Sequence, residues 1–271
     1  MLTFLKNLDK DLRNALLVQL RNLWTHTSTA IEGNALTLAE TAFVLEGELS
    51  ISGKPLKDQE DVVGHARAID LIYGYIDRSV RFSKNDLCFL HKEIQTDFIV
   101  DVYQPVGVWK NEPNSSTGFI NAKKVIFEYG KVSVIPKLME SWFALYHNFD
   151  QTILKGDTEK ALTAYVQLHV AFVRIHPFFD GNDRMARSIS NIPLLKAGLP
   201  PIIIPSELRK EYIDILSAYH FEVGQIQATG ELLPNLKELQ PFTAFCEHAW
   251  LESIVLVDEA RKIQEARQEM D

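Results

Sequence analysis

Apolar residues at helical spacing are the feature that most restricts the fold of this chain. Between Thr158 and Ile175 they recur at intervals of four and three residues, which places them on one face of a helix. Similar spacing occurs over the ranges 5–23, 37–45, 62–76 and 83–94. We therefore expect a mainly α protein, a helical bundle built around amphipathic helices.

Two places interrupt the helical pattern. From Tyr103 to Gly130 short β-branched runs flank the sequence Asn-Ser-Ser-Thr-Gly at 114–118, which has the composition of a turn. This pattern predicts a small β-hairpin with its turn at 114–118, and an irregular surface loop is the alternative. Farther on, Pro193 lies inside an apolar pattern that predicts a helix, and its ring is expected to kink that helix.

Composition excludes several classes of protein. Hydrophobic residues make up 46% of the 271 positions and charged residues 24%, which is typical of a globular domain rather than a disordered chain. The apolar runs are far shorter than the roughly 20 residues that span a bilayer, so no membrane partner is expected. A net charge of −8 argues against a nucleic-acid partner. With Cys88 and Cys246 as the only cysteines, the sequence favours a reducing, cytoplasmic location.

The residues with chemical potential gather between His176 and Arg187. Their sequence is His-Pro-Phe-Phe-Asp-Gly-Asn-Asp-Arg-Met-Ala-Arg. Pro177 should end the preceding helix near His176, because residues before proline avoid the α region. Gly181 and Asn182 then form a turn into the next helix, whose first N–H groups lack intrahelical partners. Such a helix start, preceded by glycine, can bind an anion.

Side chains in the same loop suit phosphate chemistry. Arg184 and Arg187 lie in the first turns of the second helix, where the helix dipole disfavours cations unless a polyphosphate is bound. Asp180 offers an oxygen ligand of the kind that holds Mg²⁺ together with substrate phosphates. His176 offers a base with an ordinary pKa near neutrality. Each residue alone has a structural explanation, but together they predict a phosphate-transfer site.

This loop resembles the signature of Fic-domain proteins, His-x-Phe-x-(Asp/Glu)-Gly-Asn-Gly-Arg-x-x-Arg. The matching positions are His176, Phe178, Asp180, Gly181, Asn182, Arg184 and Arg187. The resemblance implies the Fic fold, a helical bundle with a small hairpin flap. It divides the chain into an N-terminal helical segment at 1–60, a Fic core at 61–225 and a C-terminal helical extension at 226–271.

The resemblance also implies a reaction, in which AMP passes from ATP to a Ser, Thr or Tyr hydroxyl of a target protein and pyrophosphate leaves. By resemblance His176 is the base that deprotonates this hydroxyl, and Asp180 holds Mg²⁺. Gly181–Asn182 would cradle phosphates, while Arg184 and Arg187 would bind the β and γ groups.

Substrate contacts outside the loop follow from the same resemblance. Tyr212 is similar to the tyrosine of the family's adenine pocket, but Tyr219-His220 stand where related members carry an asparagine, so the contacts to the base stay open. The segment 107–128 resembles the flap that holds a target segment by β-augmentation. The target protein is unidentified, and a homodimer is left open.

A second motif lies far upstream. The residues Ser28, Glu32 and Gly33 match the family's inhibitory motif, (Ser/Thr)-x-x-x-Glu-(Gly/Asn). This resemblance implies the class with an N-terminal inhibitory helix, in which Glu32 pairs with Arg187 and keeps it from the γ-phosphate. The alternative is an exposed glutamate at a helix end, with no inhibitory role.

One position departs from the signature, because Asp183 replaces the second glycine of Gly-Asn-Gly. Its carboxylate could repel ATP, serve as an additional metal ligand, or only stabilise the helix start. Three functions therefore stay open: an autoinhibited adenylyltransferase, a phosphodiesterase in which Glu32 positions a water that removes AMP from a modified protein, and a non-enzymatic nucleotide-binding or interaction module.

Overall fold

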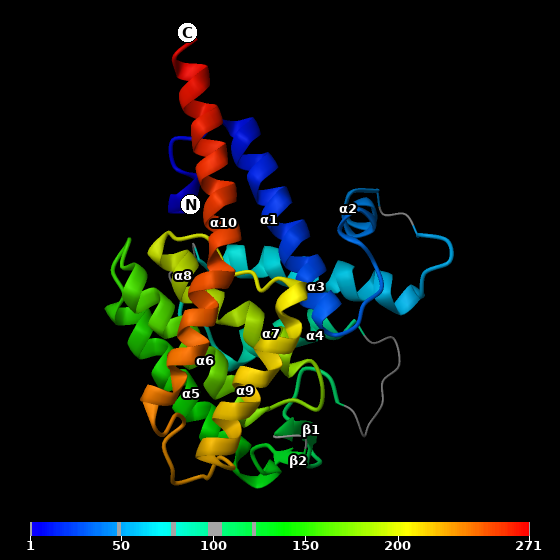
Figure 1. Cartoon of the computed structure of the whole chain (residues 1–271), viewed down its shortest axis with the longest axis vertical. Coiled ribbons are helices and arrows are strands. Elements are labelled where there is room, and N and C mark those ends of the chain that lie inside the picture. The colour runs from blue at the N-terminus through cyan, green and yellow to red at the C-terminus, as the bar shows by residue number, and fades with distance from the viewer. Residues whose placement is uncertain (1, 48–49, 77–79, 97–104, 121–122, 271) are drawn as a thin grey trace.

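The computed structural model describes residues 2–47, 50–76, 80–96, 105–120 and 123–270 (Figure 1). Within these ranges the chain is mainly helical, as predicted. The α-helices are α1 (Lys10–Ile31), α2 (Leu38–Gly47), α3 (Leu56–Ile76), α4 (Lys84–Gln95), α5 (Ile135–Thr152), α6 (Thr158–Ile175), α7 (Asn182–Ile189), α8 (Asn191–Ala197), α9 (Arg209–Val223) and α10 (Gln240–Gln268).

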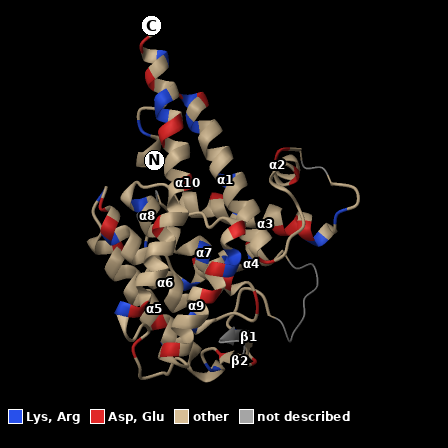
Figure 2. Cartoon of the chain, in the orientation of Figure 1, with Lys and Arg blue, Asp and Glu red and all other residues tan. Residues whose placement is uncertain are grey.

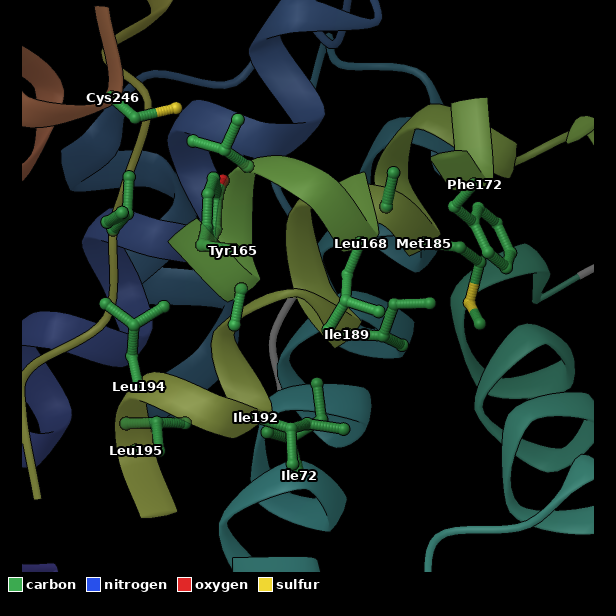
Figure 3. Close-up of a cluster of buried hydrophobic side chains, with 14 of the residues drawn as sticks. Ile72, Tyr165, Leu168, Phe172, Met185, Ile189, Ile192, Leu194, Leu195 and Cys246 are labelled. Carbon is green, nitrogen blue, oxygen red and sulfur yellow. The ribbon is translucent and has the colours of Figure 1, made fainter. Parts of the chain in front are cut away.

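Helix α6 lies at the centre of the fold. Apolar residues cover most of its circumference, and a helix of that kind must be surrounded by other elements. It contacts α5, α7, α8 and α10. Figure 3 shows Tyr165, Leu168 and Phe172 of α6 among side chains of α7, α8 and α10, where they form part of one large apolar core. Because α6 is packed on all sides, its C-terminal end holds the start of the following loop in a fixed position.

The longest helices, α1 and α10, run side by side, and their outer ends extend beyond the rest of the molecule next to both termini (Figure 1). Arg267 Nη2 pairs with Asp11 Oδ2 at 2.7 Å across this part of the fold. The main apolar core includes residues from Leu2 to Ala260, so all three segments expected from the sequence contribute to it. The boundaries near 60 and 225 stay predictions.

The predicted hairpin is confirmed, but its turn is not where the sequence suggested. Strand β1 (Ser115–Ile120) pairs antiparallel with β2 (Lys123–Glu128), with Ser116 opposite Phe127. The polar residues expected in the turn lie mostly within β1, because the ladder imposes an extended backbone that small polar residues tolerate in a two-stranded sheet. The reversal itself falls at 121–122, outside the described residues, as does Tyr103.

The helix expected to bend at Pro193 is instead two helices, α7 and α8, that meet at Ser190. Proline cannot donate the helical hydrogen bond to Ile189, so the chain changes direction before it. Gly198 ends α8 with a φ of 84°, a left-handed conformation that favours glycine. In the described part of the chain, none of the helices is both long and apolar enough to cross a membrane.

The break between α7 and α8 makes a stability prediction. Asn191 is fully buried; its Oδ1 accepts from Ile202 N–H at 2.7 Å, and its Nδ2 donates to the carbonyls of Ile202 and Arg187, each at 3.0 Å. Asn191→Ala leaves these backbone groups unpaired, at a cost of about 1–3 kcal/mol for each buried group. With three such groups, we expect the free energy of unfolding to fall by about 3 kcal/mol or more in urea titrations.

The matched control is Asn148→Ala, since Asn148 is an exposed asparagine of α5. Its unfolding free energy should stay within about 0.5 kcal/mol of the wild type. Equal stability of the two variants would show that the Asn191 hydrogen bonds do not fasten the 202 segment.

Candidate active site

The loop between α6 and α7 has a tightly determined shape. His176 ends α6 in a left-handed conformation with a φ of 51°. Asn182, at the start of α7, accepts from Phe178 N–H at 2.9 Å and donates to the Phe178 carbonyl at 3.0 Å. Gly181 has a φ of 72°, and a Cβ there would lie 2.7 Å from Gln95 Oε1, so no other residue fits well. Asn182 therefore closes the loop with its side chain.

The surroundings of His176 favour a neutral imidazole ring in a fixed orientation. Its partly buried ring lies flat against Tyr129, with 3.7 Å between centroids and 3° between planes. Its Nδ1 is 3.2 Å from the Val173 carbonyl, which can only accept, so Nδ1 carries the proton and Nε2 keeps its lone pair. Burial lowers the pKa of His176 to about 3, and the positive charge of Lys110 acts in the same direction.

Arg187 is a buried cation that joins α7 to α1. Its Nε donates to Ser28 Oγ at 3.0 Å, and its Nη2 donates to the Ser28 carbonyl at 2.9 Å and to Glu32 Oε1 at 2.6 Å. Glu32 lies just after α1, where Gly33 with a φ of 98° ends the helix. Nη1 is buried and has no hydrogen-bond partner among the described residues. The pairing of Glu32 with Arg187 that the sequence suggested is thus present, and one donor of Arg187 remains free for an acceptor.

Arg184 is held differently, by acceptors from α3 and α4. Its Nη1 donates to Asp61 Oδ1 at 3.1 Å and to the Ile94 carbonyl at 3.2 Å, and its Nη2 donates to Gln95 Oε1. Only 9% of the Arg184 side chain is exposed. The two arginines of α7 therefore meet two carboxylates, Asp61 of α3 and Glu32 just after α1, and basic and acidic residues adjoin around α7 in Figure 2.

Tyr212 of α9 forms one wall next to Arg187. The guanidinium carbon of Arg187 lies 5.8 Å from the centroid of the Tyr212 ring, within the range of a cation–π contact. The Tyr212 hydroxyl is 2.9 Å from His169 Nε2, and the whole residue is buried. Tyr212 is therefore fixed from behind by α6 before any ligand arrives.

Two cavities meet at Glu32. The larger has a volume of about 250 Å³ and the smaller about 130 Å³, and Glu32 lines both. Described residues of the larger cavity include Glu32, Ser116, Thr117, Tyr129, Asp183, Arg209, Tyr212 and His220. The smaller is lined by Thr29, Glu32, Gly33, Asn34, Lys57, Asp58, Asp61 and Arg184. A ligand that reaches from Tyr212 to Arg184 would therefore meet the Glu32 carboxylate on the way.

Asp183 brings a second acid into the larger cavity. Burial raises the pKa of Asp183 to about 6, and the negative charge of Glu32 adds to this shift while Arg187 opposes it. Carboxylates this close disfavour each other's charged form. The cavity next to Arg187 therefore holds two acidic side chains, which would repel a polyphosphate when both are charged.

Asp180 is an exposed acid at the loop's end. Partial burial would raise the pKa of its carboxyl, but the Gly181 N–H, the charge of Arg184 and a hydrogen bond from Gln95 together lower it. Its carbonyl accepts from His91 Nε2 at 3.0 Å. An ionised, accessible carboxylate suits Mg²⁺, which often binds one or two carboxylates plus phosphates and water. Within the described ranges, no three His, Cys, Asp or Glu side chains cluster closely enough to form a metal cage.

Several residues of this site escaped the sequence analysis. Asp61, Gln95 and Tyr129 come from elements far from the loop in sequence, and no local pattern marks them. Lys110 could have been noticed, because it follows the apolar run Val-Gly-Val-Trp and is a buried lysine. Its Nζ donates to Asn114 Oδ1, and its backbone N–H donates to the Pro177 carbonyl at 2.9 Å, which ties the approach to the hairpin to the loop.

Comparison with known proteins agrees with this geometry. The model of the Fic/DOC family matches residues 81–194. The chain is 28% identical over 229 residues to protein adenylyltransferase fic-1 of Caenorhabditis elegans, and 28% identical over 218 residues to protein adenylyltransferase Fic of Drosophila mojavensis. These matches cover 82% and 80% of this chain, but only 38% and 37% of the relatives. The chain thus spans about two fifths of their length.

Solved structures give the same result. A Fic domain containing signaling protein from Bacteroides thetaiotaomicron superposes with a TM-score of 0.83 and 26% identity, covering 95% of this chain and 92% of that one. Fic-1 of C. elegans superposes with a TM-score of 0.67 at 23% identity, covering 96% and 67%, and shares the fold. The mainly helical fold with its two-stranded antiparallel hairpin is the Fic fold, and residues 81–194, which include the loop between α6 and α7, are the part of the chain that matches the Fic/DOC family.

Proposed function

We propose that this chain transfers AMP from ATP to a hydroxyl group of a target protein, and that Glu32 holds it in an inhibited state. The observation that carries the proposal is the buried guanidinium of Arg187. Its Nη1 has no hydrogen-bond partner within the described ranges, and its Nη2 meets a carboxylate where a phosphate would bind. Phosphate oxygens and carboxylates suit the same planar fork of an arginine. Homology to protein adenylyltransferases supports the choice of reaction.

The base of the proposed reaction is His176. Its Nε2 takes the proton from the target hydroxyl, whose oxygen then attacks the α-phosphorus of ATP. The new oxygen–phosphorus bond forms as the bond between the α-phosphorus and the bridging oxygen breaks, and pyrophosphate leaves with that oxygen. Because burial keeps His176 neutral at physiological pH, the lone pair of Nε2 is available for this proton.

The phosphates would lie along the start of α7. In this proposal the Gly181–Asn182 backbone supports them, and the side chain of Asp180 would hold Mg²⁺, which neutralises part of their charge. Arg187 binds the terminal phosphate after it releases Glu32. Arg184 keeps its contacts to Asp61 and Gln95 and contributes its positive charge to the β-phosphate.

The two ends of the substrate pair use different elements. The base of ATP would occupy the larger cavity beside Tyr212, with His220 as a further wall. The target segment would pair with the hairpin within 107–128, since a two-stranded sheet offers free backbone groups along its edges.

Removal of the base is the first test. His176→Ala should lower incorporation of label from α-³²P-ATP into protein by about 10²- to 10⁴-fold, the range for loss of a general base. The assay uses the purified chain with cell lysate as a source of acceptor proteins. His248→Ala, at an exposed histidine of α10, is the matched control and should label at the wild-type rate. Wild-type labelling by a folded His176→Ala protein would remove His176 from the mechanism.

Release of inhibition is the second test. Glu32→Gly should raise the labelling rate by about tenfold or more, equivalent to about 1.4 kcal/mol, because Arg187 becomes free to bind the γ-phosphate. Glu269→Gly is matched, because Glu269 occupies the same position at the end of α10. An unchanged rate would exclude an inhibitory role. Loss of AMP release from already labelled protein in Glu32→Gly would favour the phosphodiesterase instead.

The third test concerns Asp183 and pH. A carboxyl with a pKa of about 6 is mostly charged at pH 7.5 and mostly protonated at pH 5. One charge about 5 Å from a phosphate costs roughly 3 kcal/mol at an effective dielectric of 20, before screening. Asp183→Asn should therefore bind Mg–ATP about fivefold or more tightly than wild type at pH 7.5, and about equally at pH 5, in titration calorimetry.

The comparison at one pH cancels the titration of ATP itself, since both proteins meet the same nucleotide. Weaker binding by Asp183→Asn with a higher magnesium requirement would identify Asp183 as a metal ligand. Identical affinities at both pH values would leave it as a helix-start residue only.

A further inference from the structure

We propose that Tyr129 is a positioning residue for His176, and that through Ser116 it couples the hairpin to the orientation of the base. This inference rests on the proposed AMP transfer for its meaning, but the geometry that carries it is independent of any substrate. Tyr129 follows β2 directly and is nearly buried.

Tyr129 contacts His176 directly. The Tyr129 and His176 rings are 3.7 Å apart and within 3° of parallel, so the tyrosine covers one face of the imidazole. The Nδ1 bond to the Val173 carbonyl restrains the ring in its own plane, and the stack restrains tilting out of that plane. A loss of the stack leaves one weak restraint, because a 3.2 Å hydrogen bond alone permits the ring to tilt.

Tyr129 is itself held by three contacts. Its hydroxyl donates to Ser116 Oγ at 2.7 Å, and its carbonyl accepts from Gln225 Nε2 at 3.0 Å. The ring of His220 meets it edge-on, 5.7 Å away. Burial raises the pKa of Tyr129 to about 12, so its hydroxyl keeps the proton it donates to Ser116. The ring that covers His176 is therefore fixed by the hairpin and by the segment after α9.

Ser116 links these contacts to the hairpin. Ser116 lies on β1 opposite Phe127 of β2, and both Ser116 and Tyr129 line the larger cavity. A displacement of β1 moves the acceptor of the Tyr129 hydroxyl, and with it the ring that covers the base. A target segment bound along the hairpin would hold β1 in place, so the base would be best oriented when an acceptor protein is present.

The test uses the whole chain and three variants. Tyr129→Leu removes the flat ring, Tyr129→Phe keeps the ring without its hydroxyl, and Ser116→Ala removes the same hydrogen bond from the other side. The first readout is the ¹⁵N NMR spectrum of the His176 ring, which reports which nitrogen carries the proton. The second is the rate of labelling from α-³²P-ATP, split into kcat and KM for ATP.

We expect wild type, Tyr129→Phe and Ser116→Ala to keep the proton of His176 on Nδ1. Tyr129→Leu should shift it partly to Nε2, lower kcat by about tenfold or more within the range expected for general-base catalysis, and leave KM for ATP within about twofold. Tyr129→Phe should lower kcat by only about threefold, because it keeps the ring but loses the bond to the hairpin, and Ser116→Ala should lower kcat by the same factor. A role in folding alone would move the thermal midpoint and not the tautomer.

Two outcomes overturn the inference. One is a folded Tyr129→Leu protein with the wild-type tautomer and kcat. If Tyr129→Leu does not fold, the double variant Ser116→Ala/Gln225→Ala loosens the Tyr129 ring without removing it. An unchanged His176 spectrum in that double variant is the second outcome that overturns the inference. Should even the wild type fail to transfer label, the proposed function falls, while the NMR comparison still decides the role of Tyr129.

Discussion

The site depends on one buried guanidinium. Arg187 is 3% exposed in its side chain, and a buried cation is tolerable only when acceptors surround it. Ser28 and Glu32 supply those acceptors from α1, which ties the N-terminal helix to α7 across 159 and 155 residues of sequence. In the proposed mechanism a phosphate takes the place of the Glu32 carboxylate, whereas substitution of Glu32 alone leaves the charge of Arg187 with only the two Ser28 acceptors. The same contacts join α1 to α7, and in the proposed mechanism they are the ones that a polyanion would exchange.

Most residues around Arg187 are held in place by several contacts. Helix α6 fixes one end of the loop, Asn182 closes it, and Arg184 is tied to Asp61 and Gln95 from α3 and α4. Glu32 differs from these, since 40% of its side chain is exposed and it borders both cavities. We infer that Glu32 is the group that moves most readily when a nucleotide binds. Asp183 adds a pH-dependent charge to the same space, which distinguishes this chain from the family signature.

The features that the sequence predicted correctly depend on local patterns of residues. The span of α6 follows from its periodic apolar residues and the proline after His176, and the contact between Glu32 and Arg187 was expected from two short motifs. The contacts that were missed join distant segments: Arg184 and Asp61 are 123 residues apart, and Tyr129 reaches His176 only through the fold. The hairpin turn was misplaced because Ser-Ser-Thr-Gly has a turn composition, while the strand ladder imposed an extended backbone. Contacts between distant segments decide the backbone conformation at such positions, and the local sequence pattern does not reveal those contacts.

The most direct test of this account is calorimetric titration of Mg–ATP and of AMP into the wild type and Glu32→Gly. If Glu32 occupies the donors of Arg187 that bind the terminal phosphate, its removal should tighten Mg–ATP binding by about tenfold or more, roughly 1.4 kcal/mol, and change AMP binding by less than about twofold. Competition between Glu32 and the terminal phosphate for Arg187 predicts this difference between the two nucleotides. Equal gains for ATP and AMP, or no gain for either, would contradict it, because Glu32 would then not compete with the terminal phosphate for Arg187.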